Sequence, residues 1–279
     1  MNELKKIVFF IIDALKKLFL LNNLSKKELQ GFSSPLTILR FLPNTIVKVP
    51  YSLGRTVRGV SFDKNILLDP AGRMCSNISK QIENKTIFDD LSKIFIEQKN
   101  MSAADIVHLN KNEKLKHYPA WAIVMPWEEL SIEEMFDSYP QYFFKNRSTN
   151  GLIFENESRE SIIKTMYSKK FIQNRIDQMA KLYKSIEEHG IIKNFDLPKI
   201  KILSKNNHWR WFMGDGGNHR SFVLSCLGHD FFLARVSSII DIKDVDNWHN
   251  VKNGTYSVIE AQNIFESYFE GSRVYRGMV

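Results

Sequence analysis

The chain has 279 residues, of which 43% are hydrophobic and 25% are charged, so we exclude collagen-like, low-complexity and wholly disordered proteins and expect a sizeable packed core. The formal net charge is +8, and residues 1–58 carry ten basic side chains against three acidic ones. A basic N-terminal arm leading into a more balanced body favours an anionic partner. Cys75 and Cys226 lie far apart in the sequence and lack the spacing of a zinc site or a disulfide framework, which indicates a reducing compartment.

Residues 4–21 have the pattern of an amphipathic helix. The uncharged apolar run, residues 7–12, is too short to span a bilayer, and no cleavage site of a signal peptide follows. Two interpretations remain open. The helix lies in a membrane interface, where its lysines meet anionic headgroups, or it docks on the protein's own core or on a second subunit. We expect a cytoplasmic protein, which in the first case is peripheral on the inner face of the cytoplasmic membrane.

The next segment, residues 31–118, is predicted to be a mostly helical accessory region. Prolines and glycines punctuate residues 31–75, which is typical of irregular connections and short strands. Apolar residues spaced by threes and fours predict a helix over 76–100, and Ser102 to Asp105 is a candidate capping box. Three arginines in this region could bind phosphates, although arginines in a loop-rich segment usually form a solvated face: Arg55, Arg58 and Arg73.

Regular elements are easier to predict from Tyr118 onward. The pattern predicts the following elements in chain order: a buried strand at Trp121 to Val124 that ends at Pro126, a helix starting at Ser131 to Glu134, a helix from Phe171 to a capping Gly190, and a hairpin of strands Ile200 to Leu203 and His208 to Met213. After residue 240, Ser257 to Glu260 predicts a capping box that opens a helix through Phe269. Ile259, Phe265 and Phe269 are expected to pack on the main body.

The most informative stretch is a glycine-rich turn between a strand and a short helix, with the sequence Gly214-Asp-Gly-Gly-Asn-His-Arg-Ser. Gly216 and Gly217 permit positive φ and close approach of a ligand, and the first N–H groups of the following helix point at the turn. Backbone donors and the positive helix end favour an anion there, and His219 and Arg220 could assist. An ordinary strand-to-helix connection would have the same sequence pattern.

Residues 119–240 resemble the ParB/sulfiredoxin fold family, nearest to its free-serine kinase and sulfiredoxin branches. The resemblance rests on the helix that ends in Ser185-Ile-Glu-Glu-His-Gly190, on the strand pair and on the turn Gly217-Asn-His-Arg220. It implies that a nucleotide binds through its phosphates at the turn, with Gly216, Gly217, Asn218, His219, Arg220 and Ser221 as the binding residues. In the sulfiredoxin phrase G-G-C-H-R a catalytic cysteine stands where this chain has Asn218, so that chemistry is excluded.

The resemblance also suggests catalytic residues. Asp215 is similar to the Asp of the kinase turn and could hold Mg²⁺ or accept a proton from an attacking hydroxyl; alternatively it bonds the turn's own N–H groups. Glu128 and Glu129 follow the first predicted strand, where the serine kinases contribute a catalytic Glu, although a solvated helix start also explains them. Arg147, in a polar loop, could close on phosphates or serve solubility alone.

The sequence thus predicts an α+β protein in four parts: an amphipathic N-terminal helix (1–30), the helical accessory region (31–118), a ParB/sulfiredoxin-like nucleotide-binding core (119–240) and a C-terminal helical extension (241–279). The predicted function is a kinase that uses ATP or ADP, with CTP as a further candidate, and Mg²⁺. It transfers a phosphoryl group to a hydroxyl of a small molecule or an envelope-glycan intermediate of polysaccharide biosynthesis. The alternatives are a ParB-like DNA-associated protein, disfavoured by a nearly balanced core without a helix-turn-helix, and a non-catalytic membrane or assembly factor.

Overall fold

A computed structural model describes residues 46–145, 156, 158–190, 197–206, 208–214 and 216–271. The predicted N-terminal helix at 4–21 lies outside these residues. The described elements follow in the order β1 (Ile46–Pro50), η1 (Tyr51–Leu53), β2 (Gly54–Arg55), η2 (Ile66–Leu68), α4 (Pro70–Ser79), α5 (Asn84–Lys99), α6 (Ala103–Ile106), α7 (Glu113–Lys116), η3 (Ala120–Ala122), α8 (Ile132–Lys145), α9 (Arg159–Met166), α10 (Lys169–His189), β3 (Lys199–Lys205), β4 (His208–Met213), α11 (Asn218–Cys226), β5 (Phe231–Asp241), η4 (Ile242–Asn247), α12 (His249–Lys252) and α13 (Val258–Glu270).

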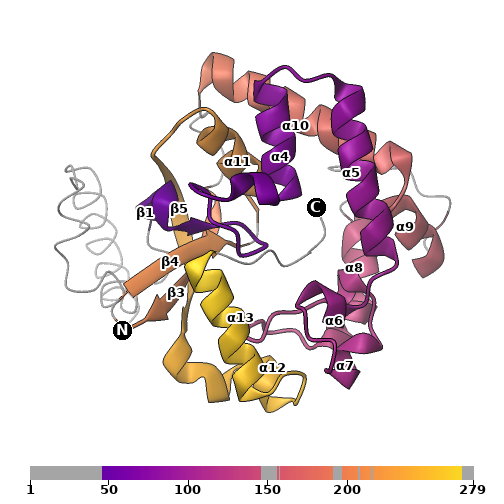
Figure 1. Cartoon of the computed structure of the whole chain (residues 1–279), viewed down its shortest axis with the longest axis vertical. Coiled ribbons are helices and arrows are strands. Elements are labelled where there is room, and N and C mark those ends of the chain that lie inside the picture. Colours follow the sequence, from indigo (N-terminus) through magenta and orange to yellow (C-terminus); the bar gives the residue numbers. More distant parts are fainter. Residues whose placement is uncertain are drawn as a thin grey trace, which may run out of the picture.

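The strands form one mixed five-stranded sheet in the order β1-β5-β3-β4-β2 (Figure 1). The predicted hairpin is present as the antiparallel pair β3 and β4, and β5 joins β3 in parallel. The edge strands β1 and β2 come from residues 46–55, so the sheet extends beyond residues 119–240. The fold is therefore a mixture of α and β structure, as expected for the α+β class.

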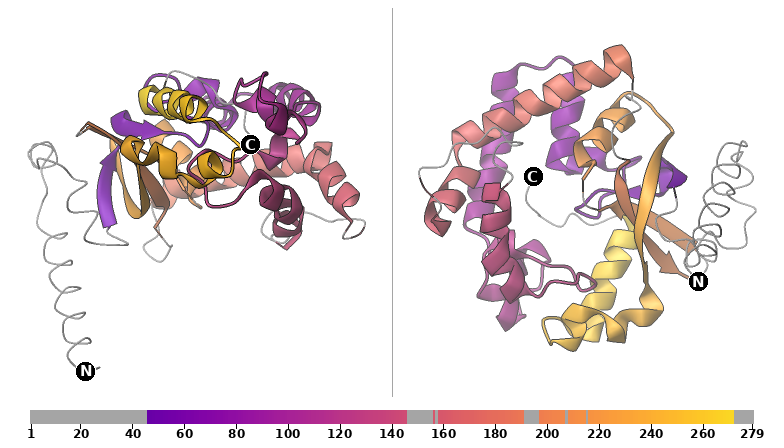
Figure 2. Two further views of the ribbon diagram at one scale, coloured as in Figure 1. Left: turned by 90° about the horizontal axis from the view of Figure 1, so that it is seen from below. Right: turned by 180° about the vertical axis from the view of Figure 1, so that it is seen from behind.

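Helices cover both faces of the sheet because apolar side chains alternate along its strands. On β4, Trp211 and Met213 belong to one hydrophobic cluster and Phe212 to the other. The first cluster is completed by α4, α5, α10 and α11, and the second by α6 and α13. Seen from below and from behind, the strands lie on one side of the molecule and α5, α8 and α9 on the other (Figure 2).

Two elements differ from the sequence prediction. Trp121 to Val124 is not a strand: Ala120–Ala122 forms the 3-10 turn η3, although Trp121, Ala122 and Val124 are buried as expected. Prolines at 119 and 126 flank this run, and proline cannot donate to a strand ladder. The helix predicted over 76–100 is two helices, α4 and α5, separated at Gln81, whose φ is +56°.

Locally encoded helix ends are confirmed. Capping boxes open α6 at Ser102 and α13 at Ser257, and Gly190 ends α10 with a φ of 69°. In α13, Phe265 and Phe269 are buried as expected. Ile259 is 70% exposed, so the expectation that it packs on the body is wrong. It follows directly on the helix's first residue, away from the stripe formed by Ala261, Ile264, Phe265, Tyr268 and Phe269.

Candidate functional site

The glycine-rich turn connects β4 to α11 and has the predicted left-handed backbone. Gly216 has a φ of 81°, and Gly217 has a φ of 90° as the N-cap of α11. A Cβ added to Gly217 would lie 2.5 Å from the Cβ of Pro198, whereas one added to Gly216 would meet no atom within 4 Å. Gly217 is thus required by both conformation and packing, and Gly216 by conformation alone. Space beside Gly216 lies open to a ligand.

Ser221 stabilises the start of α11 from inside the protein. Its side chain is fully buried, and its Oγ donates to the carbonyl of Asn218 at 2.8 Å. Its own carbonyl accepts a hydrogen bond from the Tyr51 hydroxyl at 2.9 Å. The Oδ1 atom of Asn218 is buried and has no hydrogen-bond partner. Of these two predicted binding residues, Asn218 thus keeps an unused polar atom at the helix N-terminus, while the hydroxyl of Ser221 is engaged within the helix.

The electrostatics of the site depend on Arg175, which sequence reasoning missed. It lies on α10, and its positive charge acts on His219 of α11. Burial first, and Arg175 second, lower the pKa of His219 from 6.5 to about 4, so this imidazole is neutral at pH 7. The remaining predicted residue of the turn, Arg220, is partly exposed on α11. The structure therefore brings together Gly216, Gly217, Asn218, His219 and Arg220 at one helix end, and adds Arg175.

Arg175 is a partly buried cation that is not paired with any acid among the described residues. Its Nε is buried and unbonded, and its guanidinium stacks on the Phe171 ring at 4.9 Å from the centroid. Burial lowers its pKa. Within the described part of the chain, no carboxylate pairs with it. An unneutralised guanidinium near a helix N-terminus favours an anionic ligand. The sequence contains one sign of this position: Arg175 follows the buried Ile172 by three residues and therefore lies beside the apolar stripe of α10.

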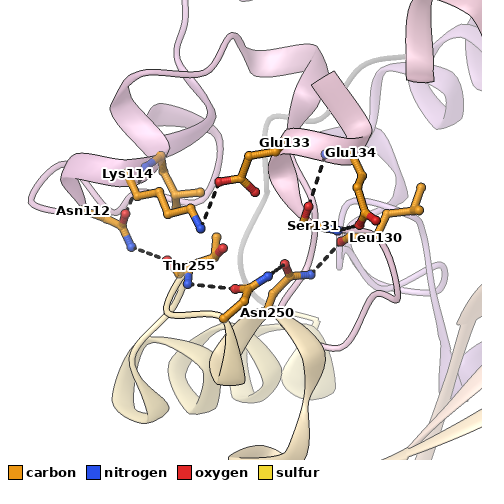
Figure 3. Close-up of polar contacts among 10 residues, drawn as sticks. Asn112, Lys114, Leu130, Ser131, Glu133, Glu134, Asn250 and Thr255 are labelled. Carbon is orange, nitrogen blue, oxygen red and sulfur yellow. Dashed lines mark hydrogen bonds and ion pairs between the residues drawn. The ribbon is translucent and has the colours of Figure 1, made fainter. Parts of the chain in front are cut away.

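Glu128 and Glu129 are not brought to the turn. Glu128 folds back on its own loop, where its Oε2 accepts the Met125 N–H at 2.7 Å, and Glu129 is exposed. The loop is fixed by Asn250 of α12, whose Nδ2 donates to the carbonyls of Met125, Glu128 and Leu130. Figure 3 shows Asn250 pointing at Leu130 from below. In Figures 1 and 2, α12 and α11 lie at opposite ends of the molecule, and α11 packs on α4 and α10 instead.

The three arginines of the N-terminal region have other roles than a solvated face. Arg55 is only 4% exposed and donates to the carbonyls of Tyr268 and Phe269 at the end of α13. Arg73 pairs with Asp90 at 3.0 Å. Arg58 is 3% exposed, is influenced by the charge of Asp69, and has an unbonded Nη2. Arg55 and Arg73 are therefore occupied by protein groups and not presented to a ligand.

Asp215 and Arg147, the predicted metal ligand and the predicted loop cation, lie outside the described residues. Among the residues that are described, no three His, Cys, Asp or Glu side chains form a group that could hold a metal ion. The turn itself fits phosphate, since it combines left-handed glycines, a helix N-terminus and an arginine that no acid of the described residues neutralises. A magnesium site at the turn would depend on Asp215.

Comparisons with protein-family models, with curated proteins and with solved structures found no match for this chain. In the described part of the structure, no helix is both long enough and apolar enough to cross a membrane.

Proposed function

We propose that the protein is a nucleotide-dependent phosphotransferase that binds its nucleotide through the phosphates at Gly216, Gly217 and the N-terminus of α11. One observation carries the proposal: a left-handed glycine N-cap opens a helix whose His219 feels the charge of Arg175, a partly buried arginine that no carboxylate of the described residues neutralises. Backbone N–H groups, the helix dipole and a guanidinium are the groups with which proteins hold phosphate. ATP or ADP is the proposed nucleotide, with CTP as a further candidate.

The order of elements supports the ParB/sulfiredoxin-like core that this proposal assumes. The family pattern has an N-terminal strand, a helix with a Ser-Ile phrase before a glycine, a strand, and a turn that opens a helix. Here β1 pairs with β5, α10 ends at Gly190, and the hairpin β3–β4 leads through the turn into α11. In this arrangement the N-terminal strand is β1, not residues 121–124.

The proposal assigns distinct tasks to the residues of the turn. Gly216 leaves room for a phosphate, Arg220 and Arg175 supply positive charge, and the neutral His219 can donate or accept one hydrogen bond. Asp215 accepts the proton of the attacking hydroxyl or binds Mg²⁺. When bound, Mg²⁺ neutralises charge on the transferred phosphoryl group. Since Glu128 and Glu129 lie at the other end of the molecule, Asp215 is the remaining candidate for the base.

A nucleotide screen and one substitution test the proposal. A ligand that binds only the native state raises the melting temperature, so we expect ATP or ADP with Mg²⁺ to stabilise the protein in a thermal-shift assay. Asp215→Asn should abolish nucleotide turnover yet retain this shift. Asp230→Asn, at an exposed aspartate after α11, is the matched control and should leave turnover unchanged. If no nucleotide changes the melting temperature, the phosphate site is wrong; if Asp215→Asn turns over nucleotide normally, its catalytic role is wrong.

The acceptor and the location are further parts of the proposal. The predicted amphipathic helix at 4–21 would place the enzyme on an anionic membrane surface, where a lipid-linked or envelope-glycan intermediate offers a hydroxyl. Co-sedimentation with vesicles that contain anionic lipid tests this step. Replacing the lysines of this segment by glutamate should release the protein from the vesicles, and binding that persists would contradict the membrane role.

A further inference from the structure

The only two cysteines of the chain, distant in sequence, meet between α4 and α11. Cys75 on α4 is fully buried, Cys226 at the end of α11 is partly exposed, and both are free thiols. Cys226 packs against the hydrophobic cluster that contains Cys75, and each thiol acts on the ionisation of the other. The two helices pack against each other and lie side by side in Figure 1. Cys226 is thus partly exposed and has a thiol neighbour.

The two thiols differ in reactivity. Cys226 is the more accessible of the two, since Cys75 is fully buried. The interaction with Cys75, assisted by the positive charge of Lys80, lowers the pKa of Cys226, whereas the interaction with Cys226 and burial raise the pKa of Cys75. Among the described residues, Tyr51 and Tyr183 also interact with the pair, and neither is charged at neutral pH. Because the thiolate is the nucleophile, the partly exposed Cys226 is the side chain that a small oxidant attacks first.

We propose that Cys75 and Cys226 are a redox-reactive pair that forms a reversible disulfide between α4 and α11, with a peroxide as the oxidant. The Cys226 thiolate attacks one peroxide oxygen, the O–O bond breaks, and the leaving hydroxide takes a proton to become water, so that Cys226 becomes a sulfenic acid. The sulfur of Cys75, losing its proton, then attacks the Cys226 sulfur. The S–S bond forms as the S–O bond breaks, and a second water leaves. An added dithiol reduces the disulfide to two thiols.

This inference does not depend on the proposed function, since it uses only the thiol pair and the packing of two helices. It does connect to the rest of the molecule, because Cys226 lies at one end of α11 and the glycine turn at the other. A disulfide at this position closes a loop that includes α5, α10 and the hairpin β3–β4. Such a crosslink restricts the unfolded chain, so the oxidised protein should melt at a higher temperature than the reduced one.

The experiment treats the full-length protein with hydrogen peroxide and counts free thiols after denaturation. In the unsubstituted protein we expect both thiols to be lost, the intact mass to fall by two hydrogen atoms, and dithiothreitol to restore both. Peptide mapping should find the bond between Cys75 and Cys226. Cys75→Ser should instead leave Cys226 as a sulfenic acid that dimedone traps, whereas Cys226→Ser should keep its remaining buried thiol.

Three results would overturn the inference: two free thiols after oxidation, a disulfide only between separate chains, or oxygen added to Cys226 without loss of the Cys75 thiol. Should a serine variant fail to fold, the thiol count and the peptide map of the unsubstituted protein still decide between these outcomes. A second measurement uses limiting iodoacetamide on the native, reduced protein. Cys226 should be alkylated several-fold faster than Cys75, and equal rates would contradict the assignment of Cys226 as the nucleophile.

Discussion

Arg175 is partly buried, its Nε has no hydrogen-bond partner, and no acid of the described residues pairs with it, an arrangement that costs stability unless a ligand compensates it. We therefore expect Arg175→Gln to weaken ADP binding about 10-fold or more, because a hydrogen bond to a charged group contributes about 1.5–3 kcal/mol and about 1.4 kcal/mol corresponds to tenfold. The same substitution should leave the melting temperature of the ligand-free protein unchanged or higher. Isothermal titration with ADP and a thermal melt measure the two effects.

Arg159 provides the control for this substitution. Its guanidinium also stacks on a ring, that of Phe136 at 4.4 Å, but it is paired with Asp137 at 3.0 Å. Arg159→Gln should leave ADP binding unchanged. Equal affinity in Arg175→Gln and the unsubstituted protein would mean that Arg175 does not contact the phosphates.

The lowered pKa of His219 predicts that the folded protein loses stability in acid. Its pKa in the folded protein is about 4, below the ordinary value of 6.5. Between these values the unfolded chain binds a proton that the native state does not, so the free energy of unfolding falls as the pH drops from about 6.5 to about 4. The full shift corresponds to at most about 3 kcal/mol. Urea unfolding of His219→Gln across this range should show a smaller decrease than the unsubstituted protein. His189→Gln, at an exposed position, should retain the full decrease, and an equal decrease in all three proteins would contradict the assignment.

At the scale of elements, the entry into α11 depends on two glycines with different requirements. We expect Gly216→Ala to lower the free energy of unfolding by about 1–2 kcal/mol, because alanine is strained in a left-handed backbone but has space here. Alanine at 217 has this cost and also collides with Pro198, so we expect Gly217→Ala to lose about 1–3 kcal/mol more. Gly228 after α11 has a φ of 80° and open space, and Gly228→Ala should match Gly216→Ala. Urea unfolding of the three variants measures the order, and equal losses would contradict the role of Pro198.

The elements that the sequence predicts well are those whose signals are local. The apolar stripe of α10, the capping boxes at Ser102 and Ser257 and the turn before α11 each depend on residues within a few positions of one another. The break between α4 and α5 was missed because the threefold and fourfold spacing continues across it. The apolar run at Trp121 to Val124 is packed in the interior but has no strand partner. A short apolar run indicates burial, and burial by itself does not distinguish a strand from a buried turn.

What the sequence could not show depends on contacts between distant residues. The strands β1 and β2 become strands only by pairing with β5 and β4, more than a hundred residues away. Arg175 meets His219, and Cys75 meets Cys226, through the packing of α10 and α4 on α11. The turn could thus be proposed as a site from its own residues. The proximity of Arg175 to the turn, and of Cys75 to Cys226, became visible only in the structure.

At the scale of the whole molecule, residues distant in sequence join the C-terminal helices to the rest of the fold. Arg55 of β2 donates to the last carbonyls of α13, and Gly271 leaves room for its guanidinium. Asn112, at the start of α7, donates to the carbonyl of Thr255 just before α13, one of the contacts drawn in Figure 3. These links are polar, and most of them are hydrogen bonds from a side chain to a backbone carbonyl. They fix the position of α12 and α13, while the two apolar clusters form the hydrophobic core of the rest of the molecule.

The side chain of Asn250 makes several such hydrogen bonds. We therefore expect one small substitution at this position to lower the free energy of unfolding strongly. The residue is fully buried, and its two amide hydrogens serve three carbonyls of the loop 125–130, while its Oδ1 accepts from Asn253. Asn250→Ala removes a donor from all three carbonyls, of which that of Met125 keeps the N–H of Glu128, in a place that water cannot easily reach, so we expect a loss of about 2–4 kcal/mol in urea unfolding. Asn263→Ala, on the exposed face of α13, should change stability by less than about 0.5 kcal/mol.

Because the loop lies far from α11, Asn250→Ala should also leave ADP affinity unchanged under conditions where the protein is folded. A loss of affinity equal to that of Arg175→Gln would mean that the loop with Glu128 and Glu129 takes part in the nucleotide site after all.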